Sequence, residues 1–416
     1  MQARKGIMES SHTSHQTPPG LSKIAVFTLA SLTAVGPLAI DMYLAALPSI
    51  SADLNTTASM AQLTLTAFML GMGAGQFVVG PLSDKTGRRR PLLVGIVLCA
   101  LATLACVFAP TVEFFIVARF IMGFTGASGL VLARAVVADS TSGLQTARLM
   151  GIMMMINGIA PVAAPLIGGI VLAHGDWRDV FKVITVMIAL SMVLVTIFIK
   201  ESLPVERRRT GSLLSAYAGI AEVVKIRRYM GFMLTMALAF GALFGYVSGS
   251  PYLLQNVLGL SETQFTYVFG VNSVGIVLAS SVMTALVGRV ALRKLLTIGV
   301  SSLVTVSLLI LIHFIMGPQL VPTLVLLFAL TCSVGMIFGN ASSLALGEAR
   351  HIAGSASAML GLTQSVMGGL ASPLVSLGGG GAYMPLALTI SSFALLAALA
   401  LLTTPKAESD YTTSSR

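Results

Sequence analysis

The sequence carries few charges for its length. Only 10% of its 416 residues are Asp, Glu, Lys or Arg, 56% are hydrophobic, and the mean hydropathy is +0.91. A soluble protein of this size usually has about 25% charged residues. The shortage of charge excludes an ordinary soluble protein and predicts a protein that lives in a membrane.

Cysteine is also scarce. The three cysteines, Cys99, Cys106 and Cys332, all fall inside apolar runs. Their spacing matches neither a disulfide framework nor a metal site, so they are interpreted as small buried residues. We therefore expect no metal and no cofactor.

The signatures of soluble enzymes are missing. The sequence has no H-E-x-x-H, no G-x-S-x-G and no phosphate-binding G-x-x-x-x-G-K-[ST]. An enzyme is therefore not expected, and ATP is not the expected energy source, which leaves ion gradients. The net charge of +10 does not indicate nucleic acid as a partner, because the basic residues fall in short loops rather than on one face.

Long apolar runs make up most of the chain, and each is long enough, or nearly so, to cross a bilayer as a helix. The twelve runs cover residues 24–50, 58–81, 91–109, 112–136, 149–173, 180–199, 230–255, 264–287, 294–316, 319–346, 354–377 and 383–403. They predict an all-α membrane protein with two pseudo-symmetric bundles of six helices, residues 23–199 and 229–404. Residues 200–228 are the predicted cytoplasmic linker, and residues 1–22 and 405–416 are the predicted cytoplasmic tails, the first of them disordered.

The basic residues predict the orientation. Of the 25 lysines and arginines, only Arg178 and Lys182 fall on the outer side of this scheme, and Arg119 and Arg134 fall within or at the edge of a helix. Loops rich in Lys and Arg stay on the cytoplasmic side. Both termini are therefore expected in the cytoplasm.

The loop at residues 80–90 anchors this topology, with five charges in seven residues, four of them positive. Gly80 and Gly87 are expected to permit a tight reversal. Asp84, Arg88 and Arg89 belong to this loop, and Asp139 and Arg148 fall at cytoplasmic helix ends nearby. These charges could lock the inner face shut, or they could be solvated loop charges that contribute little.

Ionisable groups within the spans are few, and such groups are functional candidates because they are costly in a membrane. Asp41 and Arg119 are expected at matching depth, about 10–14 Å below the outer surface. Opposite charges can compensate each other if their helices face one cavity. Asp41 is the candidate proton-coupling acid and Arg119 the group that tunes it; the alternative is a structural ion pair.

The fifth run contains Pro161, Pro165, Gly168 and Gly169. Prolines remove backbone donors and bend a helix, and small residues let a neighbouring helix approach closely. This pattern favours a gate, with ordinary packing as the alternative.

No carboxylate lies within a span of the second half, so the first half must hold any proton site. Polar, aromatic or flexible side chains of the spans are candidates to line a cavity, and each could equally form an interhelical hydrogen bond. These candidates are Tyr43, Met122, Asn157, Tyr246, Tyr252, Gln255, Asn272, Asn340 and Gln364.

Four stretches together resemble the major facilitator superfamily, and within it the twelve-helix drug:proton antiporters. Residues 80–90 resemble the G-x-L-x-D-x-x-G-R-R loop, Arg119–Gly123 resembles R-x-x-Q-G with Met122 in place of Gln, and the fifth run resembles G-P-x-x-G-G with Ala164 in place of a Gly. Residues 40–48 resemble the "DMYLPALP" sequence of the Bcr/CflA subfamily, with Ala45 in place of Pro.

The resemblance implies a bacterial inner-membrane protein that exports small apolar antibiotics, such as bicyclomycin or chloramphenicol, in exchange for protons. It also implies that Asp41 and Arg119 serve substrate and proton, and that the loop at 80–90 helps hold an outward-facing state. The expected partners are a drug, protons and the lipid bilayer, with a monomer as the working unit. A proton-coupled transporter of one small metabolite is the alternative, and a membrane sensor that moves no solute is a third hypothesis.

Overall fold

The computed structural model describes residues 21–208, 218–377 and 383–406. These residues contain twelve helical spans long and apolar enough to cross a membrane, as predicted. The elements of the first half are α1 Lys23–Asp41, η1 Leu44–Ala46, α2 Leu47–Asp53, α3 Ala58–Thr86, α4 Arg89–Val107, α5 Val112–Ser140, α6 Gly143–His174, α7 Trp177–Phe198 and η2 Val205–Arg207. Those of the second half are α8 Ala218–Lys225, α9 Arg227–Pro251, the π-helix η4 Tyr252–Val257, α10 Glu262–Leu286, α11 Leu292–Ile315, α12 Leu320–Glu348, η5 Arg350–Ile352, α13 Ala353–Ser376 and α14 Met384–Thr403.

Polar side chains set the starts of several spans. The hydroxyl of Ser22 accepts a hydrogen bond from the first turn of α1, and Thr57 and Thr111 do the same for α3 and α5. Asp176 and Ser261 form capping boxes at α7 and α10. Such caps satisfy backbone N–H groups that have no partner inside the helix. Short loops can therefore join consecutive spans.

One predicted boundary is wrong. We expected Gly80 to lie in a loop that reverses the chain, but α3 continues to Thr86, and Gly80 is helical. The reversal consists of Gly87, which has a φ of +92°, and Arg88. A helix does not have to end where its sequence turns polar, because its backbone hydrogen bonds do not depend on the side chains. Gly80 and Asp84 therefore lie on the last turns of α3.

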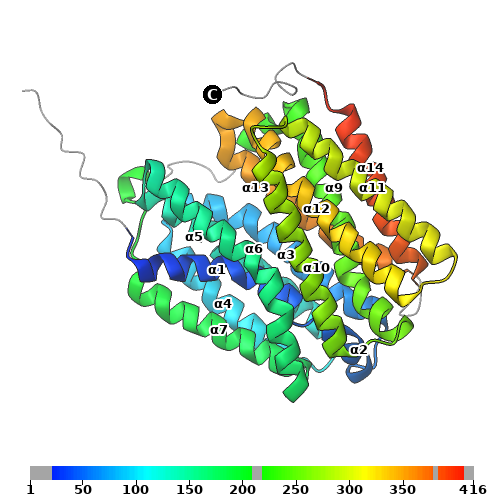
Figure 1. Cartoon of the computed structure of the whole chain (residues 1–416). Helices are drawn as coiled ribbons and strands as arrows, with labels where there is room; N and C mark the ends of the chain where they lie inside the picture. The colour runs from blue at the N-terminus through cyan, green and yellow to red at the C-terminus, as the bar shows by residue number, and fades with distance from the viewer. Residues whose placement is uncertain (1–20, 209–217, 378–382, 407–416) are drawn as a thin grey trace, which may run out of the picture.

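The helices form two bundles (Figure 1). The view shows α1, α4, α5 and α7 in one group and α9, α11, α12, α13 and α14 in the other. The bundles meet along two helix pairs, α3 with α13 and α6 with α10. This is the predicted fold. The predicted linker and tails are described only in part, and residues 218–225 of the linker form the short helix α8.

Close packing within the first bundle relies on small residues. On α3, a Cβ atom at Gly71 or Gly75 would lie 2.2 or 2.1 Å from the backbone carbonyl oxygen of Phe120 or Phe124 on α5. Glycine is the residue that permits two helix backbones to approach this closely in a membrane. The contact brings α5, which carries Arg119, against the middle of α3.

The hydrogen bonds between the bundles gather toward one end of the molecule. We call the end that contains α2 and η4 the α2 end, and the opposite end, where residues 84–90 lie, the Arg88 end. Among the described residues, every hydrogen bond between the bundles lies toward the α2 end. The bonded pairs are Ser51–Tyr252, Tyr252–Leu47, Gln255–Ala45, Ser59–Ser376 and Ser372–Gln62. The α2 end is therefore the closed end in this conformation.

Candidate functional site

Asp41 is the last residue of α1, where the first span changes direction and continues through η1 into α2. Its side chain is buried, with 8% of the residue exposed. The side chain of Asp41 makes no hydrogen bond or ion pair with any residue that the structure describes. Asp41 is thus a buried acid without a partner at a helix break.

Arg119 lies on α5 and is completely buried. Its guanidinium carbon lies 4.4 Å from the ring centre of Phe68, 4.5 Å from that of Tyr43 and 5.6 Å from that of Phe181. Nη1 donates a hydrogen bond to the backbone carbonyl of Ala39 at 3.0 Å. A cation over aromatic faces is stabilised by the ring quadrupoles without a carboxylate.

Arg119 and Asp41 do not form an ion pair in the described structure, so the compensation that we expected between them is not made by direct contact. Nε and Nη2 of Arg119 have no hydrogen-bond partner there. Tyr43, Cys99 and Cys106 are among its near neighbours. The guanidinium lies in the interior of the first bundle, where its contacts are rings, a backbone carbonyl and the sulfur of Met122.

Tyr43 and Met122, which were candidates to line a cavity, contact Arg119 in the interior of the first bundle. Tyr43 is fully buried, and its hydroxyl is hydrogen-bonded to Thr64 at 3.0 Å. Met122 is also fully buried, and its Sδ accepts from Nη1 of Arg119 at 3.4 Å. Sequence spacing alone did not show which face of each helix turns inward.

Tyr246 and Asn272 form a second buried pair, on α9 and α10. Nδ2 of Asn272 donates to the hydroxyl of Tyr246 at 2.8 Å, and the Tyr246 ring stacks on Phe269 with ring centres 5.7 Å apart. Asp41 lies within electrostatic reach of Tyr246, across the boundary between the bundles. The acid of the first bundle is therefore close to a hydroxyl group that the second bundle holds in place.

The remaining candidates lie elsewhere. Tyr252 and Gln255 bond to backbone carbonyls of η1 and α2 at the closed end. Asn340 donates to the backbone of its own helix, and Gln364 is half-buried on α13. The side chain of Asn157 lies outside the described residues.

The predicted motif of the fifth span lies on α6, which continues as one helix through Pro161 and Pro165. A Cβ atom at Gly168 would lie 2.0 Å from the carbonyl oxygen of Met42, and one at Gly169 would lie 2.7 Å from Thr266 on α10. Gly168 therefore lets α6 touch the backbone immediately after Asp41. The next residue, Gly169, lets the same helix contact the second bundle.

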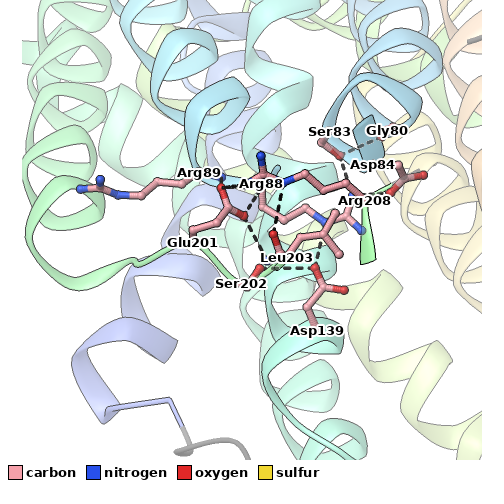
Figure 2. A network of polar contacts seen from close by, with 10 residues as sticks. All are labelled: Gly80, Ser83, Asp84, Arg88, Arg89, Asp139, Glu201, Ser202, Leu203 and Arg208. Atoms are coloured by element: carbon pink, nitrogen blue, oxygen red, sulfur yellow. Dashed lines mark hydrogen bonds and ion pairs between the residues drawn. The ribbon is translucent and has the colours of Figure 1, made fainter. Parts of the chain in front are cut away.

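A polar network surrounds the Arg88 end of the first bundle (Figure 2). Nε of Arg88 donates to Asp139 at 2.8 Å, and Nη1 donates to Ser83 and Asp84. These bonds join the ends of α3, α4 and α5. All of these residues belong to the first half of the chain, so in this conformation the network does not lock the two bundles together. Arg148 is exposed and makes no ion pair in the described structure, so it does not join this network, which agrees with the alternative of a solvated loop charge.

Glu201 was missed at the sequence level. Its carboxylate accepts from the backbone N–H groups of Arg88 at 2.8 Å and Arg89 at 3.2 Å (Figure 2). Partial burial by itself would raise the pKa of Glu201, but the donors from Arg88, Leu203 and Arg89 and the charge of Arg208 lower it overall. A carboxylate at a helix N-terminus is stabilised in this way. Nothing in the sequence links residue 201 to the start of α4, because the contact spans more than 100 residues.

The model of the Major Facilitator Superfamily matches residues 29–373. The chain belongs to this family. The membrane transporter is 36% identical over 364 residues to the "Uncharacterized MFS-type transporter YdgK" of Bacillus subtilis, with 86% of this chain and 90% of that protein covered. It is 29% identical over 363 residues to the "Bicyclomycin resistance protein homolog" of Haemophilus influenzae, with 85% of this chain and 89% of that protein covered. It is also 29% identical over 341 residues to the "Multidrug resistance protein MdtL" of Salmonella heidelberg, with 80% of this chain and 83% of that protein covered.

Solved structures share the transporter's fold at low sequence identity. A D-xylose-proton symporter has a TM-score of 0.72 at 15% identity, covering 94% of this chain and all of that one. A bacterial homologue of the lysosomal transporter Spinster has a TM-score of 0.70 at 14% identity, covering 91% and 94%. These likenesses extend to the fold alone.

Proposed function

We propose that the transporter exports small, mostly apolar antibiotics across the bacterial inner membrane in exchange for protons. Two of its relatives carry names that refer to bicyclomycin and multidrug resistance. The observation that carries the proton-coupling role is the state of Asp41, which is nine-tenths buried, without a partner, and located where the two bundles meet.

The chemistry of Asp41 follows from its burial. A carboxylate without a cation or a hydrogen-bond donor is costly to bury, whereas the neutral acid costs much less. Asp41 therefore holds a proton in this conformation and releases it when the bundles rearrange and water reaches the site. Drug and proton then alternate at one place between the bundles.

The charge distribution supports an orientation. The Arg88 end carries Lys85, Arg89 and Arg90 beside Arg88, and basic loops favour the cytoplasmic side. With that end in the cytoplasm, both termini lie inside, and the closed α2 end faces outward. We propose that the conformation described here is inward-facing and that a monomer is the working unit.

Growth assays test the substrate class. A host without its own pumps, expressing the transporter, is grown across an antibiotic panel with and without an uncoupler. Resistance to apolar antibiotics that the uncoupler abolishes supports the proposal. Resistance that survives the uncoupler, or the absence of resistance to every drug in the panel, contradicts it and favours a metabolite transporter or a sensor.

Proteoliposomes with an imposed pH gradient test the proton site. Asp41→Asn removes the proton-binding group at nearly constant volume and is expected to abolish bicyclomycin transport driven by the gradient. Asp53→Asn is the matched control, because Asp53 ends the same span but pairs with Arg178. Gradient-driven transport by Asp41→Asn at the wild-type rate would remove Asp41 from the coupling role.

A further inference from the structure

We propose that two hydroxyl groups compete for one backbone carbonyl where α3 packs against α13, and that this competition keeps the closed α2 end easy to open. The carbonyl belongs to Gln62 of α3. Ser372 of α13 holds it in the closed conformation, and Thr66 of α3 takes it over when the bundles separate. The exchange rests on the proposed function only in that opening of the α2 end is a step of transport.

The contact between α3 and α13 runs along much of both helices, and we call it the α3–α13 seam. Near the α2 end, Ser59 donates to the hydroxyl of Ser376 at 2.9 Å. Toward the Arg88 end, a Cβ atom at Gly361 would lie 2.3 Å from Oε1 of Gln76. Small residues let helices approach this closely. Those of α13 recur every three or four positions, at Gly361, Ser365, Gly369, Ser372 and Ser376.

The carbonyl of Gln62 is the acceptor of a bond that crosses the seam. The hydroxyl of Ser372, which is completely buried, donates to it at 3.0 Å. Within α3, the same carbonyl is also the acceptor for the backbone N–H of Thr66, four residues later. A backbone carbonyl has two lone pairs, so the N–H group and one hydroxyl fill its capacity. Ser372 is the hydroxyl that occupies the second lone pair in this conformation.

The hydroxyl of Thr66 is buried and has no hydrogen-bond partner in the part of the chain that the structure describes. A threonine in a helix can turn its hydroxyl to the carbonyl four residues before it, which for Thr66 is that of Gln62. Several threonines of other spans make this bond, among them Thr125, Thr185 and Thr235. Thr66 thus lacks a bond that its own helix offers, and Ser372 occupies the acceptor.

Closure of the seam therefore satisfies only one of the two hydroxyls. A buried polar group without a partner costs at least as much as one such hydrogen bond contributes. When the helices separate, Thr66 can bond to the freed carbonyl, and Ser372 can turn to water or to the carbonyl of Gly368, four residues before it. The exchange thus opposes the closure that the bonds of Tyr252 favour.

The side chain of Gln62 adds a second unpaired group to the seam. Its Oε1 is buried and has no partner among the described residues, and 3% of the residue is exposed. Closure therefore removes two polar atoms, one helical turn apart on α3, from water without giving them partners. A contact of this kind can form and break repeatedly, as a boundary that opens in each transport cycle requires.

A double-mutant cycle tests the exchange. Spin labels at Ala52→Cys and Met316→Cys, two exposed positions, report the ratio of open to closed molecules at a pH where both are populated. Thr66→Val removes the unpaired hydroxyl at nearly constant shape, so the ratio should fall about fivefold or more. Ser372→Ala should change it less than about twofold, because Thr66 then takes the carbonyl. In the Thr66→Val background no hydroxyl replaces Ser372, and Ser372→Ala should raise the ratio about fivefold.

The matched control is Ser59→Ala, which removes the other hydroxyl bond of the seam. Ser59 lies about 10 Å along α3 from Thr66, so its effect on the ratio should be the same with and without Thr66→Val. Equal effects of Ser372→Ala in the two backgrounds, or a rise in the ratio with Thr66→Val, would overturn the proposal, because Ser372 and Thr66 would then not share an acceptor.

Thermal unfolding in detergent repeats the cycle without relying on an open state. Ser372→Ala alone should leave the unfolding temperature unchanged, and in the Thr66→Val background it should lower it. Equal shifts in the two backgrounds refute the competition. Neither measurement uses a drug, so the exchange can be confirmed when the growth assays show no resistance, and it can fail when they do.

Discussion

Arg89 and Arg293 occupy equivalent places in the two bundles. Arg89 begins α4 and donates to the carbonyls of Ile199 and Thr196 at the end of α7. Arg293 lies in the first turn of α11 and donates to the carbonyls of Thr404 and Pro405 at the end of α14, at 2.7 and 2.8 Å. In each half, an arginine of the third span thus satisfies carbonyls that the end of the sixth span leaves unpaired.

The two arginines differ in burial, which leads to a prediction about stability. Arg293 is 5% exposed, whereas Arg89 is half-buried. Arg293→Ala should lower the free energy of unfolding by about 3 kcal/mol, because it leaves the carbonyl of the buried Thr404 without a donor, although Arg228 still donates to that of Pro405. Arg89→Ala should lower it by about 1 kcal/mol. Thermal unfolding in detergent measures both, with the exposed Arg90→Ala as control. Equal losses for Arg293→Ala and Arg90→Ala would disprove the role of the contact.

Glu201 predicts a pH dependence of stability at the Arg88 end. Its pKa is lowered in the folded protein from an ordinary value of 4.5. The stabilisation is therefore complete above about pH 4.5 and disappears as the pH falls through the lowered folded value. Glu201→Gln should lower the unfolding temperature at pH 7 and reduce its fall between pH 6 and pH 3. The exposed Glu206→Gln serves as control, and a wild-type pH profile in Glu201→Gln would contradict the prediction.

The hydrogen bonds of Tyr252 lead to a prediction about the equilibrium between the closed and open states of the α2 end. Its hydroxyl bonds to the carbonyl of Leu47 at 3.1 Å and to Ser51 at 2.7 Å, across the two bundles. Tyr252→Phe removes both bonds at about 1 kcal/mol each, which should shift the equilibrium toward opening of this end by fivefold or more. Distances between spin labels across the α2 end measure the shift. Tyr267→Phe, at a residue 62% exposed on α10, should leave the distances unchanged.

The contact between Gly168 and the backbone of Met42 leads to a prediction about stability and transport. A methyl group there would overlap the carbonyl of Met42, so Gly168→Ala must push α6 away from α1. We expect a loss of about 1–3 kcal/mol in stability and slower transport. Gly151→Ala is the matched control on the same helix, because nothing lies within 4 Å of a Cβ atom there. If both variants unfold at the same temperature, the contact has no energetic weight.

The twelve spans could be predicted from the sequence because each apolar run must be buried in lipid or in protein along its whole length. The charged ends could be predicted less well. Gly80 was placed in a turn, although the helix backbone continues beyond the apolar residues. Arg148 could have joined the network of Arg88 or stayed a solvated charge, and the structure leaves it exposed and outside that network.

The candidate site shows the same limit. Asp41 and Arg119 stand out in the sequence because charges within apolar runs are rare, and the structure does bury both. Their separation could not be predicted, since it depends on where α1 ends and on which rings of α3 and α7 enclose the guanidinium. No sequence pattern indicated Glu201 as a functional or structural residue, because its partners are backbone N–H groups, which every residue except proline has.

The sequence by itself determined the environment, the number of spans and the few charges that must lie within them, since hydrophobic transfer depends on composition and run length. Only the tertiary structure decided which partner each buried charge has. Hydrogen bonds and ring contacts act over a few ångströms, and residues as distant as Ala39 and Arg119 come within that range only when the helices pack.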